Sequence, residues 1–216
     1  MNQEILKNKN HVVAHHFGDA SHEFDTCKLG MWAFLAQEIL FFAGVFVAYA
    51  VFRYLYPDMF LEAHKHLSWQ MGALNTLILI TSSFTMVMGV RSVQLTQLKT
   101  AMTYLSTTLV LAGGFMVVKA FEYASKISHG LLPNVWFNAT SAFETSPIFF
   151  GCYFFMTGLH GLHVVIGMGL ILWIMLRLKK GEFRDGYFTP VEMVGLYWHL
   201  VDLIWIFLFP LLYLVG

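Results

Sequence analysis

The chain has 216 residues, of which 57% are hydrophobic and only 12% carry a formal charge. Soluble domains contain about 45–50% apolar and about 25% charged residues, so this composition indicates an integral membrane protein and excludes an ordinary soluble domain. The 13 basic and 13 acidic residues cancel, so we expect no nucleic-acid partner.

Residues 1–28 are polar and rich in histidine, and we interpret them as an N-terminal tail. Beyond them, five apolar stretches are long enough to cross a membrane, which takes about 20 residues in a helix. These stretches run over about 29–54, 71–90, 101–123, 145–176 and 190–215. We therefore predict an all-α integral membrane protein with a single membrane domain, residues 29–216, built as a bundle of five transmembrane helices.

Two of the predicted helices have recognisable starts. The sequence "TPVE" from Thr189 to Glu192 has the pattern of a capping box with proline at the first helical position, so the last helix is expected to begin there. Ser146 before Pro147 indicates a similar start for the fourth helix. The connection over residues 126–144 is long enough for an external loop.

The placement of Lys and Arg predicts the orientation in the membrane, because these residues favour the cytoplasmic side. With five spans, the tail and the loops 91–99 and 177–189 share one side. That side holds nine such residues: Lys7, Lys9, Lys28, Arg91, Lys99, Arg177, Lys179, Lys180 and Arg184. The other side holds three: Arg53, Lys65 and Lys126. We therefore expect a cytoplasmic N-terminus and an external C-terminus.

Ionisable side chains occur inside the predicted spans. They are Glu38, Lys119, Glu122, His160, His163, His199 and Asp202. A charge at the bilayer centre costs about 2.5–3.5 kcal/mol even on a lenient scale, so we expect these side chains to face the bundle interior and to have partners. Lys119 and Glu122 form an i,i+3 pair of opposite charge, whereas Glu38 has no opposite charge within a helical turn.

The last helix places Trp198, His199, Asp202 and Trp205 on one face, within an arc of about 120°. His199 and Asp202 lie three residues apart, so they can form a hydrogen bond. A carboxylate that orients an imidazole serves metal binding or proton relay. Polar contacts between spans are also a common packing device, and we favour this interpretation.

His160 and His163 are likewise three residues apart, a spacing that can place two imidazoles on one metal ion. Glu122 or His199 would have to complete such a site. With a rise of about 1.5 Å per residue, however, Glu122 and His199 fall towards opposite halves of the membrane. The spacing and the depths therefore disfavour a metal site at His160 and His163.

Several segments, in order along residues 29–216, resemble one family. They are "LGMWAFLAQEILFFAGVFVAY", "NTLILITSSFTMVMG", "KAFEYASKI", "FFMTGLHGLHVVIG" and "YWHLVDLIWIFLFPLLYLVG". The most specific parts are the "TGLHGLHV" block from Thr157 and the "WHLVDLIW" block from Trp198. Together they resemble subunit III of the haem–copper terminal oxidases, typified by cytochrome c oxidase, in its short five-helix bacterial form.

The resemblance implies a multi-pass subunit of the bacterial plasma membrane, within a respiratory complex that reduces oxygen to water and pumps protons. Such subunits pack against oxidase subunit I, beside subunit II, and the complex can belong to a larger supercomplex. They bind phospholipid in a cleft between helices and support proton uptake and stability during turnover. Haem and copper belong to the partner subunit, so we expect no cofactor in this chain.

The resemblance also implies roles for individual residues. Glu38 matches the intramembrane glutamate of the family, a carbodiimide target linked to proton uptake or to lipid. The other candidates match polar or aromatic positions associated with interhelical packing and the lipid cleft: Glu122, His160, His163, Trp198, His199, Asp202 and Trp205.

Other functions stay open. Subunit III of the quinol oxidases shares the five-helix form and both blocks, but it often has aspartate where this chain has Glu38, which favours the cytochrome c branch. Accessory subunits of nitric oxide reductases also resemble the family. An independent membrane haem protein would use His160, His163 and His199 as ligands. A small transporter is disfavoured, because the helix-breaking prolines lie at the ends of the spans.

Overall fold

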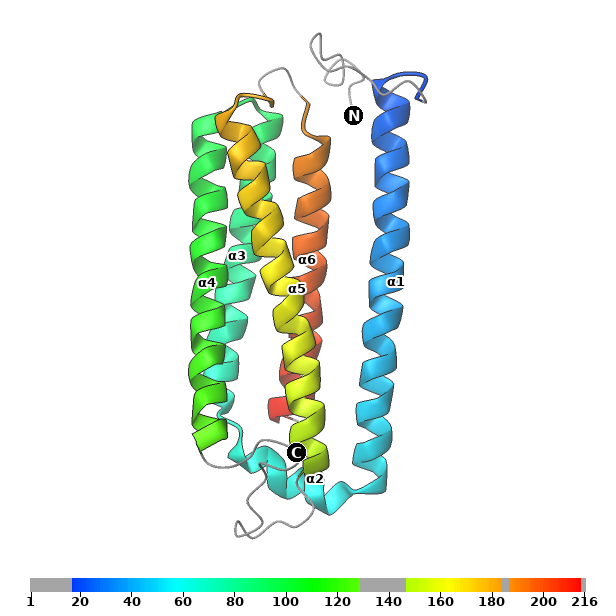
Figure 1. Cartoon of the computed structure of the whole chain (residues 1–216), viewed down its shortest axis with the longest axis vertical. Coiled ribbons are helices and arrows are strands. Elements are labelled where there is room, and N and C mark those ends of the chain that lie inside the picture. The colour runs from blue at the N-terminus through cyan, green and yellow to red at the C-terminus, as the bar shows by residue number, and fades with distance from the viewer. Residues whose placement is uncertain (1–16, 129–146, 184–186, 215–216) are drawn as a thin grey trace.

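The computed structural model describes residues 17–128, 147–183 and 187–214. The long helices are α1 Ala20–Leu55, α3 Trp69–Gln94, α4 Leu98–Ser128, α5 Pro147–Lys179 and α6 Thr189–Phe209, which continues as the π-helix η3, Pro210–Leu214 (Figure 1). A short helix α2, Pro57–Ala63, and a 3-10 turn η2, His64–His66, connect α1 to α3. The predicted all-helical fold is confirmed within these ranges, where five helices are long and apolar enough to cross a membrane.

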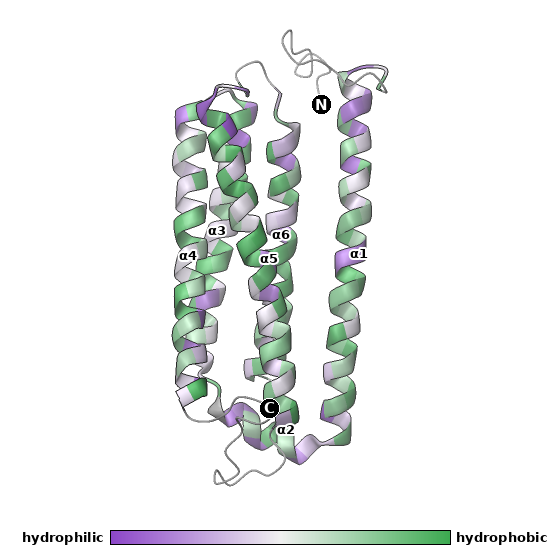
Figure 2. Cartoon of the chain, in the orientation of Figure 1, coloured by the Kyte–Doolittle hydropathy of each residue, from purple (hydrophilic) through white to green (hydrophobic). Residues whose placement is uncertain are grey.

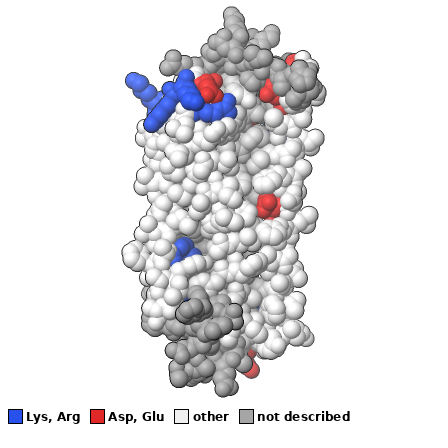
Figure 3. Space-filling model, viewed as in Figure 1, with Lys and Arg blue, Asp and Glu red and all other residues white. Residues whose placement is uncertain are grey.

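The surface of the molecule is suited to lipid. Figure 2 shows hydrophobic residues along the middle of the helices, with hydrophilic residues gathered mainly near their ends. In Figure 3 the viewed face is uncharged over most of its length, and its cationic side chains gather mainly at one end. Apolar helices of this length can cross the hydrocarbon core of a membrane, in which helices satisfy their own backbone polar groups.

Helix α6 lies at the centre of the bundle and α1 lies at its edge (Figure 1). Helices α3, α4, α5 and α6 run side by side in alternating directions, and α6 contacts α1, α3 and α5. In the most apolar 18-residue stretch of each helix, 56% of the residues are buried in α6 but only 17% in α1. The buried residues of α1 are Phe24, Leu35, Phe42 and Tyr49. The last three recur every seven residues, so α1 presents one narrow face to the bundle.

Helix α1 begins earlier than the hydropathy pattern predicts, at Ala20 rather than Leu29. The Asp19 carboxylate accepts a hydrogen bond of 2.7 Å from the backbone N–H of His22 and so caps the helix. Phe24 is buried against Phe188, with ring centroids 5.8 Å apart. A cap and one apolar anchor therefore extend the helix into the segment expected to be a tail, of which residues 1–16 lie outside the described part.

Helix α6 begins at Thr189, one residue before the predicted first helical residue, and without the expected capping contact. Among the described residues, no side chain caps its first turn, and Phe188 occupies the N-cap position. Glu192 is directed to Lys28 of α1, with 3.7 Å between the carboxylate oxygen and Nζ. The predicted capping box is therefore wrong, because Glu192 pairs with another helix. Helix α5 begins at Pro147, as predicted, and most of the expected external loop, residues 129–146, lies outside the described part.

Glycine allows α5 and α6 to approach closely. A Cβ atom added to Gly167 of α5 would lie 2.7 Å from ring atoms of Trp198 on α6. The indole ring of Trp198 is fully buried and occupies the space that a side chain at residue 167 would need. Small residues at helix contacts are how membrane helices gain packing energy without a hydrophobic driving force.

The substitution Gly167→Ala should lower the free energy of unfolding by about 1–3 kcal/mol, because overpacking forces Trp198 to move. Gly169→Ala is the matched control on the same helix, since a Cβ at residue 169 meets nothing within 4 Å. Denaturation of the two variants in mixed micelles, followed by tryptophan fluorescence, measures the difference. Equal loss of stability in both variants would contradict this account of the α5–α6 contact.

Candidate functional site

An acid–base pair joins α1 to α5 inside the membrane-spanning part. Glu38 Oε2 lies 3.2 Å from His163 Nε2, and His163 Nδ1 lies 2.8 Å from the carbonyl oxygen of Leu159. A carbonyl oxygen can only accept, so Nδ1 carries a hydrogen and donates it. An imidazole nitrogen and a carboxyl oxygen thus link the two helices inside the membrane-spanning part.

The sequence leaves Glu38 without a partner because its partner lies on another helix. Depth along a helix is counted from its end, and the observed ends of α1 and α5 differ from the predicted ones. Counted from the observed ends, Glu38 lies roughly 27 Å along α1 and His163 roughly 24 Å from the end of α5, at about 1.5 Å per residue. The two side chains are therefore nearly level, and each remains only 13–14% exposed.

Two apolar grooves flank this pair along α1 and α5. One, of about 440 Å³, also borders α6 and is lined by Met31, Phe34, Ile166 and Leu170 as well as by the pair itself. The other, of about 420 Å³, is lined by Gly44, Ala48, Gly151, Cys152 and Phe155 among others. The ring of Phe42 packs edge-on against His163 at 5.1 Å and contributes to the contact between the two helices. Both volumes fall in the range of about 300–1,000 Å³ typical of small-molecule pockets.

A buried ionic cluster ties α4 to α5 and to the C-terminal turn η3. Lys119 Nζ donates to Glu122 Oε2 at 2.9 Å, to Tyr153 Oη at 3.0 Å and to Tyr213 Oη at 3.1 Å. Lys126 Nζ lies 3.3 Å from Glu122 Oε1, which also accepts a 2.7 Å bond from Tyr213. All three donors of the Lys119 ammonium are thus used. The predicted Lys119–Glu122 pair is confirmed, whereas its three further members were not predicted.

His160 occupies the core of the bundle and is separate from the Glu38–His163 pair. Its ring is fully buried and lies 5.2 Å from the ring of Trp205 and 5.6 Å from that of Phe115. Trp205 donates its indole N–H to Thr76 Oγ1 at 3.0 Å. The two histidines contact different neighbours, since His163 is directed to Glu38 of α1 and His160 to Trp205 and Phe115 in the centre of the bundle.

His199 and Asp202 do not form the predicted hydrogen bond. His199 Nδ1 lies 2.7 Å from Ser83 Oγ on α3, and both Asp202 oxygens are buried without a hydrogen-bond partner among the described residues. Because α3 packs against α6, the hydroxyl group of Ser83 takes the place beside the His199 imidazole that the sequence suggests for the Asp202 carboxylate. On the same helix, Trp198 donates its indole N–H to Ser82 Oγ at 3.2 Å.

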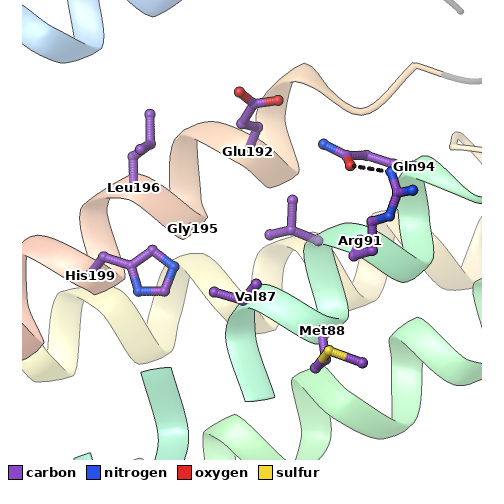
Figure 4. A pocket seen from close by; sticks show the side chains of 9 residues that line it. Val87, Met88, Arg91, Gln94, Glu192, Gly195, Leu196 and His199 are labelled. Atoms are coloured by element: carbon purple, nitrogen blue, oxygen red, sulfur yellow. Dashed lines mark hydrogen bonds between the residues drawn. The ribbon is translucent and has the colours of Figure 1, made fainter. Parts of the chain in front are cut away.

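His199 lies at one end of a groove of about 340 Å³ between α3 and α6 (Figure 4). Arg91, Gln94 and Glu192 line the other end, while Val87 and Leu196 contribute apolar wall. The groove is a surface feature of the α3–α6 contact, on a different side of α6 from the grooves beside α1.

The predicted site residues are therefore distributed among separate contacts. There are four such contacts: Glu38 with His163, Lys119 with Glu122, His160 with Trp205, and His199 with Ser83. Within the described ranges, no three His, Cys, Asp or Glu side chains gather closely enough to hold a metal ion. These contacts connect helices through polar groups that would otherwise be unpaired in lipid.

Comparison with known proteins gives a match over nearly the whole chain. The family model "Cytochrome c oxidase subunit III" matches residues 10–216. Cytochrome c oxidase subunit 3 of Thermostichus vulcanus is 34% identical over 199 residues, covering 91% of this chain and 92% of the relative. The subunit 3 of Corynebacterium diphtheriae is 31% identical and covers 87% of both chains. Quinol oxidase subunit 3 of Bacillus subtilis is 30% identical and covers 87% and 86%.

The fold and its polar contacts define a multi-pass helical membrane protein whose ionisable groups serve mainly in contacts between helices. The relatives are named as subunits of respiratory oxidases. The chain belongs to the cytochrome c oxidase subunit III family, as its motifs in residues 29–216 indicate.

Replacing Glu122 by glutamine should lower the free energy of unfolding by about 3–5 kcal/mol, because two buried ammonium groups lose their counter-charge. The control is Glu62→Gln, which removes the carboxylate of an exposed pair with Lys65 and should cost at most about 1 kcal/mol. Denaturant titration of the full chain measures both. A Glu122→Gln variant as stable as the Glu62→Gln control would disprove a structural role for the cluster.

Proposed function

We propose that this chain is the non-redox subunit III of a proton-pumping cytochrome c oxidase, in which it packs against subunit I beside subunit II. The observation that carries the proposal is the family match over residues 10–216. Oxygen reduction then takes place in the complex, and the haem and copper belong to the partner. In this role the chain has no catalytic residue and no metal ligand, and its polar groups hold the helices together.

Quinol oxidase subunit III is the alternative, since relatives of both names cover this chain to a similar extent. We favour the cytochrome c branch on account of Glu38, where quinol oxidases often have aspartate. An accessory role in a nitric oxide reductase is a further alternative. A haem liganded by this chain itself is not favoured, because His163 and His199 already use ring nitrogens in contacts with Glu38 and Ser83.

The two grooves beside α1 support the proposal of phospholipid binding. Their walls are almost entirely apolar, they lie between membrane-spanning helices, and each has the volume of a small-molecule site. A lipid acyl chain has the shape and apolarity to fill such a groove. The Glu38–His163 pair holds α1 against α5 between them, so we propose that it maintains the shape of the grooves.

Support of proton uptake follows from the same role. A subunit that keeps α1 and its lipids in place can stabilise the neighbouring subunit during turnover without moving protons itself. The side that holds nine Lys and Arg residues is then cytoplasmic, with the N-terminus, in the plasma membrane of a bacterium. A larger respiratory supercomplex is a further proposed setting.

Gentle solubilisation tests the assembly. A tagged chain should co-purify with a larger membrane protein that contains haem and copper. Stripped from that partner, the chain should show no haem absorbance and no bound copper. Purification as a free monomer, or a Soret band in the isolated chain, would refute the proposal.

The groove can be filled by mutation. Gly44→Leu adds a side chain to the second groove without a clash, because a Cβ at residue 44 meets nothing within 4 Å. Native mass spectrometry of the purified protein should then detect fewer retained phospholipid molecules. The control is Gly30→Leu on the same helix, which also meets nothing within 4 Å. An unchanged number of lipids in Gly44→Leu would argue against this groove as their site.

A further inference from the structure

Unpartnered polar side chains lie in the core of the bundle. Asn75, His160 and Asp202 are at most 3% exposed. Both polar atoms of each side chain lack a hydrogen-bond partner among the residues that the structure describes. A buried polar group left unpaired loses its hydrogen bonds to water without compensation, and the cost is larger when the group is charged. We therefore ask what could satisfy these three side chains.

Two of these residues lie beside Trp205, and the third is next to its hydrogen-bond acceptor in the sequence. The His160 ring lies 5.2 Å from the indole ring, and Asp202 precedes Trp205 by three residues, on the same face of α6. The indole N–H of Trp205 donates to Thr76, which follows Asn75 directly on α3. The unpartnered groups thus come from α3, α5 and α6, the helices that meet at the seam around Trp205.

Protein side chains in this seam are already engaged elsewhere. Ser82 accepts from Trp198. Ser83 pairs with His199 at 2.7 Å, so this one hydroxyl group is shared between His199 and the Asp202 carboxyl group, which it also approaches. Lys119 lies 5.2 Å from the face of the Trp205 ring and uses its three donors on Glu122 and two tyrosines. The missing partners must therefore be small and able both to donate and to accept hydrogen bonds, because an amide, an imidazole and a carboxyl group all need them.

We propose that the seam around Trp205 binds ordered water molecules, which hydrogen-bond to Asn75, His160 and Asp202. Buried waters in proteins make about three hydrogen bonds to groups that would otherwise be unpaired, and one water needs only about 10–15 Å³ of probe-occupied space. The site is a hydrated core inside a membrane-spanning bundle. It goes beyond the proposed function and does not depend on the identity of the oxidase.

The sign of a stability change separates a hydrated seam from a dry one. Asn75→Leu and Asp202→Leu replace polar side chains by apolar ones of similar size. In a hydrated seam each change removes bonds to water and leaves its neighbours unpaired, so the unfolding equilibrium should shift about tenfold towards the unfolded state. Thr108→Val provides the reference, since Thr108 is buried with a known partner, Thr85, at 2.8 Å. A gain of stability in both leucine variants would overturn the proposal.

Radiolytic footprinting of the unmodified full chain gives a test that does not depend on a variant folding. X-ray pulses convert bound water to hydroxyl radicals, which label adjacent side chains. Trp205 is fully buried, so its oxidation requires water within the bundle. Phe149 is also fully buried but packs among Phe60 and Phe150, and it should stay unlabelled. A Trp205 that remains as unmodified as Phe149 would rule out the bound water.

Discussion

The cost of an unpaired charge in hydrocarbon is the constraint on which this structure depends. Glu122 shows most clearly how this cost is avoided. Its two carboxylate oxygens accept hydrogen bonds from Lys119, Lys126 and Tyr213, with donor–acceptor distances of at most 3.3 Å. Each partner that comes from another element also fixes that element in space. The buried charges therefore favour one arrangement of the helices, since a helix that slid or rotated would leave a charge without its partner.

The same logic explains why α6 is central and α1 peripheral. Helix α6 carries two buried tryptophans, each of which donates its indole N–H to a hydroxyl group of α3. Helix α1 is attached through a few separated points: Glu38 to His163, Lys28 to Glu192, and Tyr49 to the carbonyl oxygen of Leu211. Between these points its contact with α5 opens into grooves, which is where lipid binding is proposed.

The sequence alone predicted the five spans and the pair of Lys119 and Glu122, because hydropathy and i,i+3 spacing are local properties. Contacts between helices were not accessible in this way. The Glu38–His163 pair depends on how α1 and α5 are aligned against one another, which no pattern within a single helix determines. The hydrogen bond expected between His199 and Asp202 failed for a related reason, since a local pattern cannot show that Ser83 of α3 competes for the imidazole.

The geometry of the Glu38–His163 pair has an electrical consequence. Each elementary charge that moves across an energised membrane changes energy by about 2.3 kcal/mol per 100 mV. Glu38 Oε2 and His163 Nε2 lie 3.2 Å apart on two helices that stand side by side and at nearly the same depth. A hydrogen that passes from one side chain to the other therefore crosses almost none of the transmembrane voltage.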